Sequence, residues 1–155
     1  MKGYGHMGCC SLLAIQKVVS VDPQDRDDLD YGASPDQPDL KNCGGYQELA
    51  PIFLGSEAIQ AQRKADSEPS SKAFDDPEAV AREYLTSTER SLVSQTLKLT
   101  VRRKGNGRII YDGLDRSSGT KFMIVISRPY LLLFYAQNPK YVAWVPIAAY
   151  KLLCG

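Results

Sequence analysis

The feature that most constrains the fold is a change of hydrophobic period near residue 96. Leu97, Leu99 and Val101 alternate with polar residues, and a period of two is typical of a half-buried strand. The sequence Gly105-Asn106-Gly107 follows, which favours a tight turn, and "RIIYDG" supplies a returning run of the same kind. The stretch from residue 97 to residue 113 is therefore predicted to be a β-hairpin.

Three further apolar runs follow the hairpin, and short turn sequences separate them. Each is short and nearly continuous, which is typical of a strand covered on both faces. The last residues, "AAYKLLCG", suggest a final helical turn. Together these patterns predict an antiparallel meander of about five strands, of which the last three are "KFMIVIS" (121–127), "YLLLFYA" (130–136) and "YVAWVPI" (141–147).

One clear helix start precedes the sheet. In Asp75-Asp76-Pro77-Glu78, Asp75 is the expected capping residue, Glu78 follows three residues later, and Pro77 lies in the first turn. We expect the main helix over about 76–93 and a shorter one over 56–64. The predicted fold class is α+β: one main helix packed on the meander sheet, preceded by a long irregular acidic N-terminal arm.

The domain boundary is predicted near residue 73. Residues 1–73 form an extended, loop-rich acidic arm with short apolar islands such as 12–21 and 49–54, and residues 74–155 form a basic helix-plus-sheet domain. Apolar islands in a loop-rich arm are typical of segments that become ordered against a partner. We therefore expect the arm to make intermolecular contacts.

Charge is distributed very unevenly along the 155 residues. The net charge is only +1, but residues 1–60 carry four basic and nine acidic groups. From Thr96 onward ten basic residues face only Asp112 and Asp115. Such a field attracts anionic partners. The alternative is an internal match, in which the acidic arm lies on the basic domain.

The candidate binding residues cluster at the hairpin. Arg102, Arg103, Lys104 and Arg108 surround the turn, and Tyr111 lies close enough to be a candidate stacking ring. Basic side chains with an exposed aromatic ring suit nucleic acid, whereas the cations alone suit an acidic protein. Lysine and arginine on a hairpin also occur simply to keep a sheet edge from pairing.

No pattern names a reaction. Asp112 and Asp115, with Lys121 nearby, are the candidates for a metal-dependent nuclease, but aspartates in turn-rich segments are commonly structural. A metal-independent ribonuclease using Arg108 and Tyr111 is a further alternative. We expect no cofactor, no metal site and, on balance, no enzymatic activity.

The four cysteines, Cys9, Cys10, Cys43 and Cys154, form no C-x-x-C motif and fit no disulfide framework. They predict reduced thiols in the cytoplasm or another reducing intracellular compartment. A dyad of Cys43 with His6, the only histidine, is the one arrangement for thiol catalysis. No apolar run has the roughly 18–20 residues of a transmembrane helix. "MGCC" (7–10) lacks the position and the Ser spacing of an acylation signal, so we expect no membrane anchor through Cys9 or Cys10.

These observations favour a non-enzymatic protein-interaction or assembly module, an accessory subunit of a larger complex. It would contact protein partners through its arm and its basic sheet edge. The first alternative is a nucleic-acid-binding domain that uses residues 102–108 with neighbouring aromatic rings. The second is a small ribonuclease or other hydrolase.

Overall fold

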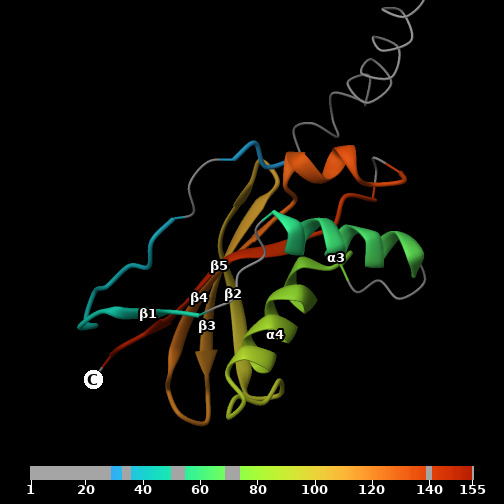
Figure 1. Cartoon of the computed structure of the whole chain (residues 1–155). Coiled ribbons are helices and arrows are strands. Elements are labelled where there is room, and N and C mark those ends of the chain that lie inside the picture. The colour runs from blue at the N-terminus through green and yellow to red at the C-terminus, as the bar shows by residue number, and fades with distance from the viewer. Residues whose placement is uncertain (1–28, 33–35, 50–54, 69–73, 139–140, 155) are drawn as a thin grey trace, which may run out of the picture.

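The computed structural model describes residues 29–32, 36–49, 55–68, 74–138 and 141–154. It confirms the predicted α+β class: helices pack on a five-stranded antiparallel sheet (Figure 1). The first 28 residues of the predicted arm lie outside the described residues. The elements in chain order are β1 (Tyr46–Glu48), α3 (Ser56–Ser67), α4 (Pro77–Thr88), β2 (Leu97–Gly105), β3 (Arg108–Asp115), β4 (Lys121–Ser127), the 3-10 helix η1 (Tyr130–Phe134) and β5 (Val145–Leu152).

The sheet has the strand order β1-β5-β4-β3-β2. Strands β2, β3 and β4 form the predicted meander, β5 pairs with β4, and β1 adds to the far edge of β5. Gly105 pairs with Arg108 across the hairpin, which leaves Asn106 and Gly107 as a two-residue loop. Both have positive φ, 53° and 68°, as a type I′ turn requires. The hairpin prediction is therefore confirmed.

Side chains on the two faces of the sheet belong to two separate cores. On one face Tyr111 and Ile124 pack with residues of α4 such as Leu85. On the other face Ile110 and Val125 pack in a cluster that includes residues of α3 and η1. Successive residues of a strand point to opposite faces. Because β3 and β4 are covered on both faces here, apolar residues follow one another along each strand.

The main helix is shorter than its sequence pattern suggested. It covers Pro77–Thr88. The capping side chain is Asp76 and not the expected Asp75, and its Oδ1 accepts a 3.0 Å hydrogen bond from the Glu78 amide. The backbone turns extended at Glu89, although Leu92 is still buried in the same core. Leu92 keeps the spacing of the buried helical residues although it lies after the helix. The predicted helix was therefore too long at its C-terminal end.

Two predicted elements near the C-terminus have a different structure. "YLLLFYA" was expected to be a strand, but Tyr130–Phe134 is a 3-10 helix that follows Pro129. A leucine run has high helix propensity, and a short apolar run alone does not separate strand from helix. The fifth strand is instead Val145–Leu152, so "AAYKLLCG" is mostly strand and not a helical turn.

Described residues on both sides of position 73 contribute to the same cores. Leu49 is buried in the α4 core, and Ala58 and Ala61 of α3 are buried in the other core. At the far edge of the sheet, the Gly44 amide donates to the Leu153 carbonyl at 2.9 Å. The residues from 43 to 49 are thereby integrated into the sheet domain.

A disulfide bond joins Cys43 to Cys154, across 111 residues of sequence. This differs from the expectation that all four cysteines are reduced thiols. Sequence spacing did not indicate the bond because the two cysteines meet only after β1 pairs with β5. Cys9 and Cys10 lie outside the described residues.

Candidate functional site

The predicted basic cluster does not form one continuous patch. The register of β2 against β3 shifts between Val101 and Arg103, which marks a β-bulge. Arg102 lies at this bulge, and Arg103 pairs with Ile110 immediately after it. Each of the four cations of the cluster consequently has surroundings of its own.

Arg102 reaches across to the neighbouring strand. Its Nε donates to Asp112 Oδ2 at 3.0 Å, a second bond joins its Nη2 to Oδ1 of the same carboxylate, and its Nη1 lies 3.9 Å from the sulfur of Met123. The pair is partly exposed, with side-chain exposures of 33% for Arg102 and 44% for Asp112. It therefore remains accessible to a ligand on this face.

Arg103 and Arg108 both pair with carboxylates of the acidic segment that precedes the sheet. Arg103 forms an exposed ion pair with Asp36. Arg108 forms a buried one with Asp30, at 2.7 Å between Nη2 and Oδ2. Ser127 also donates to Asp30 Oδ2, at 2.8 Å. For these residues, the acidic segment does lie on the basic domain.

Lys104 and Tyr111 complete the predicted site, and they differ sharply. Lys104 is exposed on β2, and no ion pair joins it to another described residue. The Tyr111 ring is only 3% exposed and lies in the core with α4, so it offers no free face to a base. Its burial, together with Glu78 and Asp76 nearby, raises the pKa of Tyr111 to about 12.

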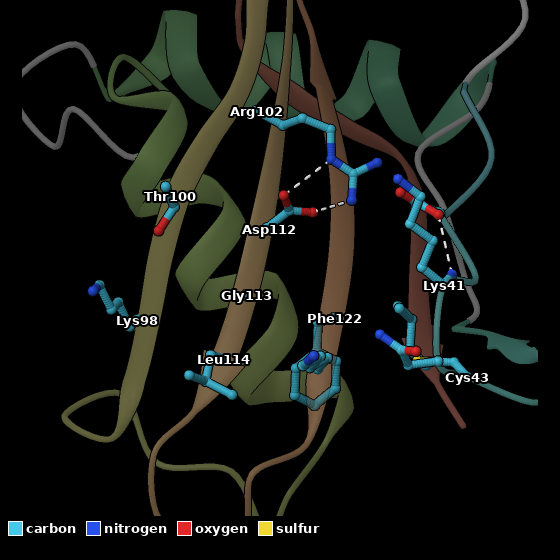
Figure 2. A pocket seen from close by; sticks show the side chains of 13 residues that line it. Lys41, Cys43, Lys98, Thr100, Arg102, Asp112, Gly113, Leu114 and Phe122 are labelled. Carbon is cyan, nitrogen blue, oxygen red and sulfur yellow. Dashed lines mark hydrogen bonds and ion pairs between the residues drawn. The ribbon is translucent and has the colours of Figure 1, made fainter. Parts of the chain in front are cut away.

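The structure adds basic residues that the hairpin motif did not include. Lys41, Lys98 and Lys121 line a cavity of about 440 Å³ together with Arg102 and Asp112. Figure 2 shows the cavity over β2, β3 and β4, with Lys41 and Cys43 at its side. The alternation in β2 was the available signal for Lys98, because it lies on the same face as Thr100. Nothing in the sequence pointed to Lys41.

The two carboxylates considered for a metal-dependent nuclease are not brought together. Asp112 and Asp115 are three residues apart in β3 and therefore point to opposite faces. Hydrogen bonds from the Ser118 and Thr96 hydroxyls lower the pKa of Asp115 to about 2, which is the pattern of a turn-stabilising carboxylate. Within the described ranges, no group of three metal-ligating side chains occurs.

Cys43 does not provide a free thiol, because it is bonded to Cys154. The other member of the proposed dyad, His6, lies outside the described residues. The arrangement for thiol catalysis is thus absent from the part of the chain that the structure describes.

None of the described helices has the length and apolar character needed to cross a membrane.

Comparison with protein families, with characterised proteins and with solved structures found no match to this chain.

Proposed function

We propose that this chain is a non-enzymatic protein-interaction module that adds an extended, acidic segment of a partner to the free edge of β2. The observation that carries the proposal is the state of this edge. β2 is nine residues long and pairs with β3 along that length, and no other described strand pairs with its outer side. A free edge is a template for strand addition, in which backbone hydrogen bonds supply affinity.

The side chains of β2 favour an acidic partner strand. Lys98, Arg102, Arg103 and Lys104 all come from this one strand, and Val101 is 51% exposed between them. Carboxylates on the added strand would complement these cations, and complementary charge mainly sets specificity and the rate of association. A second copy of β2 is disfavoured because its own cations would repel the same edge.

The N-terminal arm was expected to contact a partner, and only part of it lies among the described residues. Its described portion contacts its own domain through Asp30, Asp36 and β1. Residues 1–28 lie outside the described residues, and their contact with a partner, as an accessory subunit of a larger complex, stays part of the proposal. The informative truncation therefore removes 1–28 and leaves β1 and α3 in place.

Nucleic acid remains the alternative partner, because Lys98, Lys104 and Lys121 are exposed and unpaired with any described carboxylate. Two observations make it the weaker candidate. The three arginines of the hairpin already have carboxylate partners, and Tyr111 is buried. Hydrolysis has less support still, since Asp112 and Asp115 point to opposite faces.

A defined peptide tests the main proposal. The probe is a synthetic ten-residue peptide of alternating Glu and Thr, with a Lys-Thr peptide of equal length as its control. We expect the Glu-Thr peptide to shift NMR signals of β2 amides and to slow their hydrogen exchange. Lys104→Glu should weaken this binding, whereas Arg63→Glu, an equal charge change on α3, should leave it unchanged.

The same titration separates the alternatives. Equal binding of both peptides, or shifts confined to residues outside β2, would contradict strand addition. If a single-stranded oligothymidine binds at these residues, with an affinity that falls steeply as salt is raised, while the Glu-Thr peptide does not bind, nucleic acid becomes the better assignment.

The state of Cys43 and Cys154 bears on the compartment in which the protein works. The sequence led us to propose a reducing intracellular compartment, which leaves Cys43 and Cys154 as thiols. The disulfide between them is instead typical of oxidising environments. Alkylation of the protein in freshly lysed cells, followed by mass spectrometry, distinguishes the two: both cysteines are modified in a reducing compartment, and neither is modified if the bond is present.

A further inference from the structure

The cavity on the open part of the sheet has a composition that strand addition does not explain. Its volume is about 440 Å³, within the range of small-molecule sites. Its floor is the face of β2, β3 and β4 that α3 and η1 leave uncovered, and its side is the segment from Asp39 to Cys43 (Figure 2). The charged residues of its lining are Lys41, Lys98, Arg102, Lys121, Asp39 and Asp112.

The register of the strands brings the lysines to one row of this face. Lys98 on β2 pairs with Leu114 on β3, and Leu114 pairs with Lys121 on β4. Neighbouring strands lie about 4.8 Å apart, so the two lysines stand on either side of Leu114, with backbones roughly 10 Å apart. Lysine side chains are long and flexible, so both ammonium groups can turn toward a single anionic group above Leu114.

The next row toward the turn adds further hydrogen-bond donors. Thr100 pairs with Asp112 and brings a hydroxyl to the cavity wall. Arg102 binds Asp112 through its Nε and Nη2, which holds the guanidinium over this face. The disulfide to Cys154 and the bond from the Gly44 amide to Leu153 tie the side wall of the cavity to the sheet.

The net positive charge of the cavity lining favours an anionic ligand. Its lining carries four cations and two carboxylates, a net charge of +2, and neither Lys98 nor Lys121 forms an ion pair with a described residue. A phosphate monoester carries about −1.5 to −2 at neutral pH and three acceptor oxygens. We propose that this cavity is a binding site for the phosphate group of a small phosphate monoester, a site that shares Lys98 and Arg102 with β2 but extends over β3 and β4 to Lys41 and Lys121.

Phenyl phosphate and phenyl sulfate provide a matched pair of probes, because they have the same shape and differ in charge above pH 7. We expect phenyl phosphate at pH 8 to shift the amide signals of Lys98, Thr100 and Leu114, and to bind about tenfold or more tightly than phenyl sulfate, as one extra charge near several cations implies. Equal binding of the two probes would contradict a site built for a dianion.

Two variants locate the site. Lys98→Gln combined with Lys121→Gln should weaken phenyl phosphate binding about tenfold or more, while the thermal midpoint of the exposed double variant reports that it is folded. Lys104→Gln, on the same strand but outside the cavity, should change binding less than about twofold. An equal loss in both variants means diffuse attraction to a basic surface and overturns the proposal.

A phosphorylated side chain of a protein is the other source of the same group. A short phosphoserine peptide therefore forms a second arm of the titration, and its tighter binding would overturn the small-molecule assignment. Lys98 and Arg102 belong to both proposals, whereas Lys104 lies outside the cavity lining and Lys121 lies on β4, away from the free edge. Loss of acidic-peptide binding in Lys104→Glu and loss of phosphate binding in Lys121→Gln therefore tell the failure of one proposal from the failure of the other.

Discussion

Two aspartate–arginine pairs on one face of this sheet have the same chemistry and opposite surroundings. Asp30 and Arg108 are 8% and 9% exposed and lie where the sheet is covered. Asp112 and Arg102 are 44% and 33% exposed and lie where it is open. In the covered region the charges are part of the fold, and in the open region they remain accessible to a partner. Burial, more than residue type, therefore decides which basic residues belong to a candidate site.

The largest expected effect comes from breaking the buried pair. Asp30→Ala removes a carboxylate that accepts from Arg108 Nε and from the Ser127 hydroxyl, both at 2.8 Å. We expect a loss of about 3–5 kcal/mol in the free energy of unfolding, because one partner of a buried pair is left behind. Urea denaturation measures it. Adding Arg108→Met should recover part of the loss, and a loss below 1 kcal/mol would place Asp30 with the exposed pairs.

The second prediction concerns the disulfide, which fastens the side wall of the open region. Cys154→Ser should lower the free energy of unfolding by about 2–4 kcal/mol, because the bond closes a loop of 111 residues in the unfolded chain. Urea denaturation in the presence and absence of a phosphine reductant measures the effect. Wild type and variant should coincide once reduced, and a difference that persists under reduction would assign the loss to packing at Cys154 instead.

The third prediction addresses the exposed pair. Asp112→Asn should change the free energy of unfolding by only about 0–1 kcal/mol, because partly exposed ion pairs contribute little. The same variant should tighten phenyl phosphate binding, since it removes a carboxylate from the cavity lining. Thermal unfolding and calorimetric titration of one sample give both values. A large loss of stability would mean that the Arg102–Asp112 pair stabilises the fold as much as the buried Arg108–Asp30 pair does, against the expectation from their exposure.

The sequence predicted the local features of this fold better than the long-range ones. Alternation and Gly105-Asn106-Gly107 were enough for the hairpin, because both signals are local. The edge position of β1, the disulfide and the Asp30–Arg108 pair depend on contacts across 78 to 111 residues. A charge count could pose the question of an internal match, but only the fold shows which aspartate meets which arginine.

The same limit applied to the candidate site. The hairpin motif selected Arg102, Arg103, Lys104 and Arg108 by their closeness in sequence. Strand pairing instead groups Arg102 with Lys98 and Lys121 and buries Arg108 with Asp30. A prediction that had followed alternate residues of β2 would have found Lys98, but the position of Lys121 beside it requires the register of three strands.

The last prediction concerns the pH dependence of Asp115, a carboxylate held by hydroxyl groups instead of by an arginine. Its pKa in the folded protein is lowered to about 2 from the ordinary value of 3.8, first by the Ser118 hydroxyl and then by Thr96. A carboxylate with a lowered folded pKa stabilises the fold above its unfolded pKa, and this contribution is lost as pH falls through the folded value. Thermal midpoints of wild type and Asp115→Asn should therefore differ by a constant amount from pH 7 to about pH 5, and should converge between about pH 4 and pH 2. Curves that stay parallel to pH 2 would show that the hydroxyl bonds do not favour the charged form, and that this turn resembles the exposed pair more than the buried one.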